Sequence, residues 1–593
     1  MSGSPTTSSP ESVSAGAGLD RLRQVGRGLP SRAPGLLLGA VLLATLGLPV
    51  GLFLVVAFSP RLFSQGTAWL TGAGFTGAIQ GGALQGLVNS VAVSSIAAVG
   101  SLAIGLALAW FTSRSSLWGR RFWPLLIWAV LLAPSYLVAL GWEQLLANHG
   151  SFWEMGFRLP WLTSLFFGPV GVVFVYILKG VPFAYLATSL AMLALGGEFE
   201  DAARIHGAGR WGAWRVLLPM IAPAIWSALA VVFAETISDF GVAYTLAASS
   251  KFQLATYTLF GAVDSFPSQF PVAAAVGWLL IGAVGVALFL QSRALRGRLY
   301  GSLSGRTRPP TRVALGPLGQ ALGLALITGY FLFSLGVPAL GAIAGSLLQP
   351  ASRGFAITGL TLSYYQALLH DGALLTPLTY SAEIAAVVAT LVALIAVPVA
   401  MYLTRAGGGV TAKAVDLVLL GTVALPGIVL GAGYIFVYNL PGLNAIGIRL
   451  YGTTALLGMA YFAGALPTAA RVLVGPVAQV DRAPVVAARV HGSGSIGAIR
   501  HALVPVVSRS LLWAWILTFT GVMFELPVSQ LLYPPGSPTL SVAITMALGL
   551  DFYGPGTAMS VVSVAFALAV VGAALLLFRW LTPVGWRQVG ATR

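Results

Sequence analysis

Residues 202–209 read Ala-Ala-Arg-Ile-His-Gly-Ala-Gly, and residues 487–494 read Ala-Ala-Arg-Val-His-Gly-Ser-Gly. Six of the eight positions are identical, and the two central glycines, Gly207 and Gly492, lie 285 residues apart in a chain of 593. Each copy is a polar, arginine-bearing island in an otherwise apolar sequence. The duplication predicts two equivalent halves that each present the same loop to a common partner.

The composition is that of an integral membrane protein. Charged residues make up 8% of the chain and hydrophobic residues 57%, with a mean hydropathy of +0.88; an ordinary soluble domain is about 25% charged. The apolar segments are continuous and about 20 residues long, which favours helices over the shorter alternating strands of a barrel. Cysteine is absent, which excludes disulfides, thiol chemistry and iron–sulfur ligation.

The apolar segments predict an all-α membrane protein of about 12 transmembrane helices, in two repeats of six. The expected spans of the first half lie near 36–58, 87–112, 122–146, 165–192, 222–247 and 270–291. Those of the second half lie near 317–345, 380–404, 414–437, 452–474, 508–533 and 558–581. The predicted domains are a disordered cytoplasmic tail (1–33), a first repeat (34–292), a basic cytoplasmic linker (293–315) and a second repeat (316–593).

The distribution of basic residues predicts the orientation. With both termini in the cytoplasm, most of the 32 lysines and arginines fall on the cytoplasmic side, as the positive-inside rule requires. The net charge of +16 therefore reflects membrane orientation, and nucleic acid is not expected as a partner. Each half has an even number of spans, so the repeats are parallel. Asn89-Ser90 and Tyr380-Ser381 begin matching spans, and Pro134-Ser135-Tyr136 in the third span of the first half corresponds to Pro426-Gly427-Ile428 in the second half.

The duplicated loop resembles a known motif. Glu200-Asp201-Ala202-Ala203, then Gly207 and later Pro219, resemble the EAA loop of ATP-binding-cassette importer permeases, which reads Glu-Ala-Ala, three residues, Gly and a later Leu-Pro. In that family the loop forms a short cytoplasmic helix that docks on a separate ATPase subunit. Small alanines permit close approach, glycine permits a sharp turn, and proline suits the first turn of the following span. The alternative is an ordinary Ala/Gly-rich turn.

The resemblance assigns coupling residues to both loops. In the loop 198–220 they are Glu200, Ala202, Ala203, Gly207 and Pro219, and in the loop 481–506 they are Ala487, Ala488, Gly492 and Pro505. The copies differ, because Val485 and Val486 replace the acids of the first loop, whose spacing from glycine to proline is one residue shorter. His206 and His491 are interpreted as docking or capping residues, and no metal site is expected.

The resemblance extends over nearly the whole chain and implies the type I ABC importer permease fold. Fused permeases with two EAA loops are typical of the ferric-iron import group, with relatives for thiamine, phosphonate and polyamine. Residues 524–527, Phe-Glu-Leu-Pro, followed by Leu531-Leu532, resemble the Arg-Glu-Leu-Pro-Ala-Thr-Leu-Leu segment of iron-type permeases, with Phe524 and Ser529 departing from it. The implied function is the translocation pathway of an importer, with ferric iron as the first expected substrate.

Acidic residues inside predicted spans are candidates for the pathway. Asp239 follows Pro219 by 20 residues and Glu525 follows Pro505 by 20 residues, which places both about 30 Å from the cytoplasmic loops. An acid in hydrocarbon costs about 2.5–3.5 kcal/mol on insertion scales and usually faces a cavity. We predict that Asp239 and Glu525 face each other across the pseudo-two-fold axis and line or gate the pathway. The alternative is a structural hydrogen bond to a neighbouring span or loop.

Three further charges belong to the same hypothesis. Glu235 lies one turn before Asp239 on the same helical face and is a candidate pathway residue, as is Glu143. Lys179 could pair with Glu143 or bind substrate.

The chain has no nucleotide-binding motif of its own. None of its three lysines (Lys179, Lys251, Lys413) lies in a P-loop pattern, so no catalytic residue is expected and ATP with Mg²⁺ would be bound by a partner. The resemblance implies two ABC ATPase subunits, a periplasmic or lipid-anchored substrate-binding protein, and a multi-pass location in a bacterial inner membrane. No cofactor is expected on this chain. An ion-gradient-driven secondary transporter is the rival class, and a membrane enzyme is a weaker one.

Overall fold

The computed structural model describes residues 33–582 apart from 197–204, 207–209, 297–311, 349–359, 406–409 and 550–552 and the single residues 149, 155, 371, 373, 424, 446, 448 and 482. The predicted tail and most of the predicted linker lie outside the described residues. So do Glu200, Ala202, Ala203 and Gly207 of the first loop. Within the described part the elements are helices, joined by two isolated β-bridges.

The first half contains six long helical segments. They are α2 (Ala33–Leu42) continuing through the π-helical turn η1 (Leu43–Gly47) into α3 (Leu48–Val56), α5 (Ala83–Arg114), the pair α6 (Trp123–Leu132) and α7 (Ser135–Leu146), α10 (Pro169–Ala194), α12 (Arg210–Ser238) and α14 (Phe270–Leu295). Shorter elements are η2 (Pro60–Phe63), α4 (Ala73–Gln80), α8 (Ser151–Glu154), α9 (Pro160–Phe166), η3 (Ala243–Ala247) and α13 (Ala255–Asp264).

The second half repeats this order. Its long segments are α15 (Pro317–Phe331) with η4 (Leu332–Gly336) and α16 (Val337–Leu347), α18 (Leu375–Arg405), the pair α19 (Val410–Val423) and α20 (Gly427–Tyr438), α22 (Thr454–Ala478), η6 (Ile499–Leu503) with α25 (Val504–Met523), and α28 (Tyr553–Leu581). Shorter helices are α17 (Ser363–His370), α21 (Pro441–Ala445), α23 (Ala483–Val490), α24 (Ser495–Ala498), α26 (Pro527–Leu532) and α27 (Leu540–Gly549).

The number of continuous spans is lower than predicted. Ten helices in the described ranges are long and apolar enough to cross a membrane, and eleven if α6 and α7, which meet at 91°, form one span. The predicted span 414–437 is divided between α19 and α20. Both breaks precede a proline, Pro134 and Pro426, because proline disfavours the helical conformation in the residue before it and removes a backbone donor.

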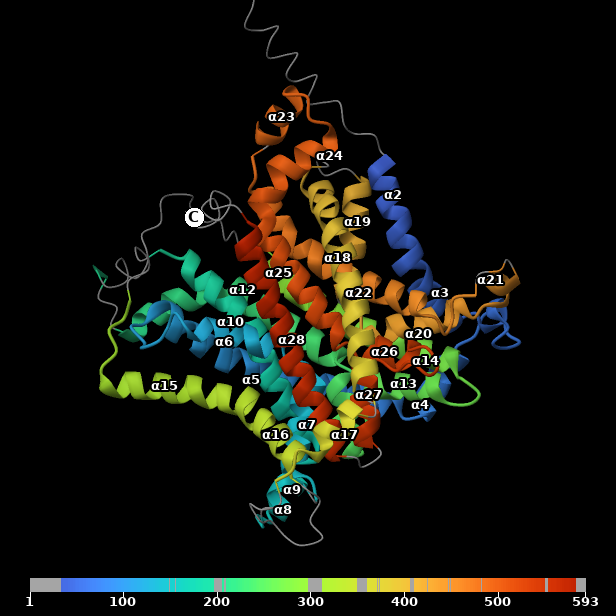
Figure 1. The fold of residues 1–593 in the computed structure, drawn as a ribbon, viewed down its shortest axis with the longest axis horizontal. Helices are drawn as coiled ribbons and strands as arrows, with labels where there is room; N and C mark the ends of the chain where they lie inside the picture. Colours follow the sequence, from blue (N-terminus) through green and yellow to red (C-terminus); the bar gives the residue numbers. More distant parts are fainter. Residues whose placement is uncertain are drawn as a thin grey trace, which may run out of the picture.

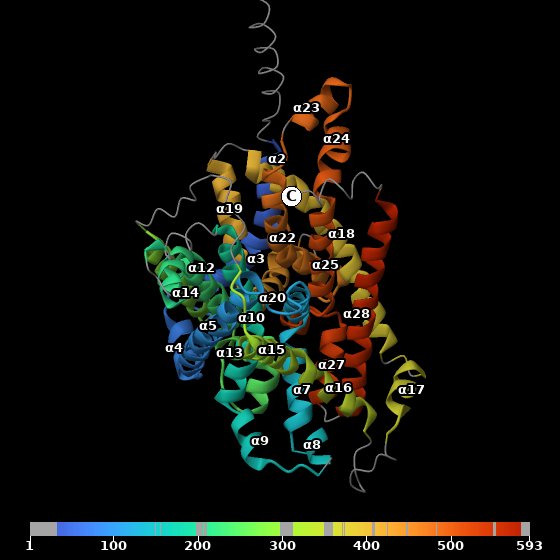
Figure 2. The ribbon, with the colours of Figure 1, turned by 90° about the vertical axis from the view of Figure 1, so that its left-hand side faces the viewer.

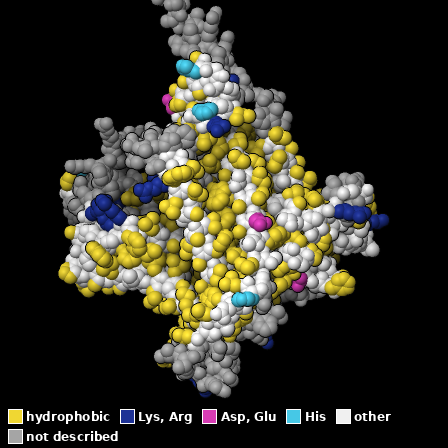
Figure 3. Space-filling view, in the orientation of Figure 1, with side chains coloured by type: hydrophobic (Ala, Val, Ile, Leu, Met, Phe, Trp, Pro, Cys, Tyr) yellow, Lys and Arg dark blue, Asp and Glu magenta, His cyan; other side chains and the backbone are white. Residues whose placement is uncertain are grey.

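The two halves form separate bundles that diverge from a common edge. Figure 1 shows α5, α6, α10 and α12 extending to the left, whereas α18, α22, α25 and α28 extend upward; in Figure 2 the first bundle is seen nearly end-on while the second stays upright. Hydrophobic side chains cover much of the face over α25 and α28 (Figure 3), as expected for contact with lipid. The helix pair α23–α24 lies at the far end of the second bundle (Figure 1).

The first span of each half packs against the other half. Helix α3 contacts α20, and α16 contacts α7, so the second segment of each broken span is covered by the first span of the opposite half. Glycines allow this close approach. A Cβ on Gly433 of α20 would lie 2.8 Å from the Pro49 carbonyl oxygen, and one on Gly141 of α7 would overlap the Pro338 backbone.

A second internal repeat, which was not predicted, lies where each first span packs against the opposite half. Residues 43–49 read Leu-Ala-Thr-Leu-Gly-Leu-Pro, and residues 332–338 read Leu-Phe-Ser-Leu-Gly-Val-Pro. Both form a π-helical turn before the proline, because the proline lacks an N–H for the upstream carbonyls. Tyr434 of α20 donates its hydroxyl to the Thr45 carbonyl at 2.7 Å. Trp142 of α7 donates its indole N–H to the Phe333 carbonyl at 3.2 Å.

Candidate functional site

The predicted pathway acid of the first half lies directly after α12. This helix ends at Ser238, where the predicted span 222–247 continued, because the Asp239 carboxylate starts a new helical turn. Its Oδ1 accepts a hydrogen bond from the Val242 N–H at 2.8 Å, an N-terminal capping arrangement that satisfies an otherwise free donor. Its Oδ2 accepts from the Ser135 hydroxyl at 2.5 Å, at the first residue of α7. Asp239 therefore joins the end of α12 to the broken span.

Glu525 makes the equivalent arrangement in the second half. Helix α25 ends at Met523, and the Glu525 carboxylate accepts hydrogen bonds from the N–H groups of Val528 and Ser529, both at 2.9 Å. These donors lie in the first turn of α26, where a carboxylate is also favoured by the helix dipole. The predicted span 508–533 is thus interrupted. Both acids thus make the structural hydrogen bonds to neighbouring segments that were considered as the alternative to a pathway role. A pathway role for either acid remains a prediction.

Two further pairs of bonds repeat around the acids. The Thr256 hydroxyl donates to the Asp239 carbonyl at 3.0 Å, and the Ser541 hydroxyl donates to the Glu525 carbonyl. At the start of α13 the Ala255 N–H donates to Ser90 at 3.0 Å. At the start of α27 the Leu540 N–H donates to Ser381 at 2.8 Å. Since Ser90 and Ser381 were aligned from the sequence, the same framework holds the acid in each half.

Tyr244 and Gln530 mark where the halves meet. They are 286 residues apart, the same offset as Asp239 and Glu525, and the Gln530 side-chain amide donates to the Tyr244 hydroxyl at 2.9 Å. Equivalent residues of a two-fold repeat can touch each other only at its axis. The pseudo-two-fold axis therefore passes beside this bond. Tyr136 also lies near this boundary, because its hydroxyl is within electrostatic range of the Glu525 carboxylate.

The first half carries charges that the second half lacks. The Lys179 ammonium on α10 donates to the Val130 carbonyl at 2.7 Å and to the Ala133 carbonyl. It caps the end of α6, whose last carbonyls have no intrahelical donor. At the 285-residue offset of the two loop glycines, which applies to the helix before each loop, the residue corresponding to Lys179 is Gly464. At the 286-residue offset of the two acids, the residue corresponding to Glu235 is Gly521.

Glu235 and Glu143 differ in their surroundings. The Glu235 side chain is exposed on α12 and lies within electrostatic range of Lys179 and Asp239. In the described ranges its carboxylate has no hydrogen-bond partner. The Glu143 carboxylate accepts from the Ser249 hydroxyl at 2.9 Å. The pairing of Lys179 with Glu143 considered above is replaced by these contacts.

The second of the two duplicated loops projects from its bundle. Helix α23, which contains Ala487 and Ala488, has no buried residue and ends at Val490. It is followed by Gly492, whose φ of 88° only glycine adopts without strain. A His491 ring nitrogen lies 2.8 Å from the Ala487 carbonyl oxygen, which is the capping position considered for this residue. The loop therefore presents its small side chains outward.

The two prolines occupy different positions in their helices. Helix α12 begins at Arg210, so Pro219 lies inside the helix, but it is in the first turn of the apolar span Leu217–Ser238. Pro505 is in the first turn of α25, but the π-helical turn η6 precedes it. The π turn relieves the missing donor, and the segment from Ile496 to Met523 runs as one span.

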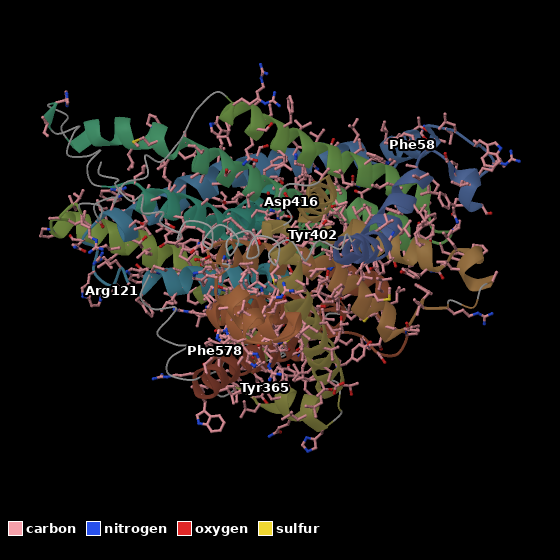
Figure 4. The ribbon with its side chains drawn as sticks, turned by 90° about the horizontal axis from the view of Figure 1, so that it is seen from above. Phe58, Arg121, Tyr365, Tyr402, Asp416 and Phe578 are labelled. Carbon is pink, nitrogen blue, oxygen red and sulfur yellow. The ribbon has the colours of Figure 1, made fainter. Side chains whose placement is uncertain are left out.

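One ion pair was not anticipated. The Arg471 guanidinium on α22 donates to the Asp416 carboxylate on α19 at 2.8 Å. Figure 4 shows Asp416 and Tyr402 near the middle of the molecule in the view from above. The distance of 55 residues between the partners gave no sequence signal for the pair.

Comparison with known proteins agrees with this architecture. Residues 101–339 match the family of binding-protein-dependent transport system inner membrane components. A probable ABC transporter permease, y4fN, from Sinorhizobium fredii is 25% identical over 64% of this chain and 66% of its own length, just under two thirds. The Fe(3+)-transport system permease FbpB 2 of Haemophilus influenzae is 23% identical over 75% of this chain and 80% of its own.

A shorter relative names a different substrate. The sulfate transport system permease CysT of Escherichia coli is 26% identical over 32% of this chain and 69% of its own length. The family match spans α5 to α16 and contains the first of the two duplicated loops. The chain therefore combines an all-helical membrane fold with a first half similar to the inner membrane components of binding-protein-dependent transport systems, and the relatives that it resembles are ABC transporter permeases.

Proposed function

We propose that this chain forms the translocation pathway of an ATP-binding-cassette importer between its two halves. The observation that carries the proposal is the bond between Tyr244 and Gln530, which joins equivalent positions at the axis. Because α12 has 29 residues and rises about 43 Å, Tyr244 lies at the end of the pathway opposite the coupling loops. The bond closes the outer end while the bundles diverge toward the loops.

The energy source is a pair of partner ATPases that dock on the two loops. The exposed helix α23 offers the small residues Ala487 and Ala488, and the first loop would offer Ala202 and Ala203. ATP and Mg²⁺ belong to those partners. Closure of the ATPase pair would draw the loops together and open the outer end, where a periplasmic or lipid-anchored substrate-binding protein delivers its cargo. This assigns the chain to a bacterial inner membrane with both termini in the cytoplasm.

For the substrate we propose ferric iron, and the charges of the first half support a cation. Glu235 offers an exposed carboxylate, whereas the Lys179 ammonium is engaged by the carbonyls at the end of α6. The exposed Glu235 carboxylate favours a cation over an oxyanion such as sulfate. Thiamine and polyamine, which are also cationic, and phosphonate remain the alternative cargoes.

The test is uptake by cells that express the complete transporter with its own ATPase and binding protein. Radioactive ferric iron and radioactive sulfate are offered in parallel to wild type, Glu235→Gln and the coupling variant Gly492→Asp. Iron uptake that Gly492→Asp abolishes and Glu235→Gln reduces supports the proposal. Uptake that survives both variants would exclude the importer role, and uptake of sulfate alone would exclude the cation.

A further inference from the structure

The end of the linker between the repeats is hydrogen-bonded to the first half. The Ser116 N–H donates to the Val313 carbonyl at 3.0 Å, and the Val313 N–H donates to the Arg114 carbonyl at 2.9 Å. From α15, the Gln320 side chain donates to the Ser116 carbonyl at 2.9 Å and accepts from the Trp118 N–H at 3.1 Å. The turn between α5 and α6 is thus fixed to the beginning of the second half.

This contact gathers three arginines. Arg120 and Arg121 come from the α5–α6 turn and Arg312 from the linker. Arg120 interacts electrostatically with both of the others; partial burial and these like charges lower the pKa of Arg120. Among the described residues no acid forms a salt bridge with this cluster. The fold therefore holds Arg121 and Arg312 within electrostatic range of Arg120, and an anion that approached the three charges would be attracted by all of them.

Apolar side chains adjoin the cluster. Trp118 is 76% exposed, Phe122 53% and Leu125, in the first turn of α6, 64%. Figure 4 places Arg121 at the edge of the molecule. On a membrane helix, exposed apolar residues face lipid, and aromatic residues beside them occupy the interfacial layer. Positive charge and apolar surface thus meet at the level of the lipid headgroups.

We propose that Arg120, Arg121 and Arg312 bind the headgroup of an anionic phospholipid of the cytoplasmic leaflet. Its acyl chains lie along Trp118, Phe122 and Leu125. Clusters of basic residues at this depth attract anionic headgroups. Because Arg312 belongs to the linker and the other two belong to the first half, the bound lipid strengthens the connection between the first bundle and α15.

The test uses the full chain with its ATPase subunits, in nanodiscs of phosphatidylcholine alone or mixed with phosphatidylglycerol. Native mass spectrometry measures retained phosphatidylglycerol, and thermal unfolding measures its effect on the midpoint. The variant R120Q/R121Q/R312Q is compared with R293Q/R296Q/R579Q, which removes three other arginines from the ends of α14 and α28. We expect the cluster variant to bind phosphatidylglycerol about 100-fold more weakly, since each arginine contributes roughly a factor of five, and the control to bind like wild type.

Three results would overturn the assignment. Equal retention of phosphatidylglycerol by the cluster variant and wild type would show that the lipid binds elsewhere. Equal losses in the cluster and control variants would show a non-specific charge effect. Stabilisation by inorganic phosphate in phosphatidylcholine nanodiscs, equal to that by the lipid, would show a site for a free anion. If the glutamine variant does not fold, R120K/R121K/R312K keeps the charges but loses the fork geometry, and it should retain the lipid more weakly than wild type.

Discussion

Replacement of Tyr244 by phenylalanine isolates the contact at the axis. The change removes the acceptor of the Gln530 amide, which lies 2.9 Å away, while the ring and its packing against Phe240 and Phe260 remain. A lost hydrogen bond of this kind costs about 1 kcal/mol, which shifts a two-state equilibrium about fivefold. If the bond holds the outer end closed, its loss makes opening easier by that factor.

The assay is ATP hydrolysis by the reconstituted transporter without its binding protein. We expect Tyr244→Phe to raise this basal rate by up to about fivefold, because the resting closure then opposes ATP-driven opening less. Tyr257→Phe is the matched control, since Tyr257 packs against Tyr244 and against Phe260 and its hydroxyl has no hydrogen-bond partner in the described ranges.

A double-mutant cycle decides whether one bond is responsible. Gln530→Met should raise the basal rate as Tyr244→Phe does, and the double variant should add little to either single change. Additive effects of the two changes on the basal ATPase rate would refute the idea that the bond between Tyr244 and Gln530 holds the outer end closed. An equal rise of that rate in Tyr257→Phe would refute it as well.

Three other changes test the framework around the site. Lys179→Met leaves the Val130 and Ala133 carbonyls without their donor. It should lower the free energy of unfolding by about 1–3 kcal/mol, measured as a lower thermal midpoint. Gly464→Met, at the corresponding position without such carbonyl contacts, should lower the midpoint less. Gly433→Ala places a Cβ 2.8 Å from the Pro49 carbonyl oxygen and should destabilise the protein by about 1–3 kcal/mol; Gly442→Ala, with open space around it, should be neutral, and a neutral Gly433→Ala would contradict the packing. Gly492→Ala forces an L-residue to a φ of 88° at a cost of about 1–2 kcal/mol and should reduce ATPase recruitment in co-purification, unlike Gly494→Ala, whose glycine does not have a positive φ.

The sequence allowed the membrane class and the repeat to be predicted because both depend on local patterns. Apolar length located most of the helices, and the duplicated loop at Gly207 and Gly492 gave the offset that aligns the halves. An offset one residue longer, 286, pairs Asp239 with Glu525, because the first loop is one residue shorter, and the structure places both acids just after equivalent helices. The comparisons agree with the resemblance to the permease family, since residues 101–339 match its inner membrane component.

Tertiary contacts decided the features that were missed. The break at Pro134 follows from a local rule, but the donor that satisfies the Ala133 carbonyl at the break is the Lys179 ammonium, 46 residues further along the chain. The ends of α12 and α25 depend on carboxylates that cap the next turn, whereas hydropathy predicted a continuous span. The repeat before Pro49 and Pro338 was visible in the sequence, yet its partners Tyr434 and Trp142 lie in the opposite halves.

The exchange of first spans constrains how this protein is made. Helix α7 leaves the ribosome well before residues 337–347, which form the α16 surface that covers it. The first half therefore cannot complete its packing until the second half has begun to insert, and a ribosome stalled within the linker would leave an unfinished bundle. Cutting the linker after synthesis has the opposite outcome, because α3 and α16 still hold the halves together. The two halves are covalently joined during assembly and interlocked afterwards.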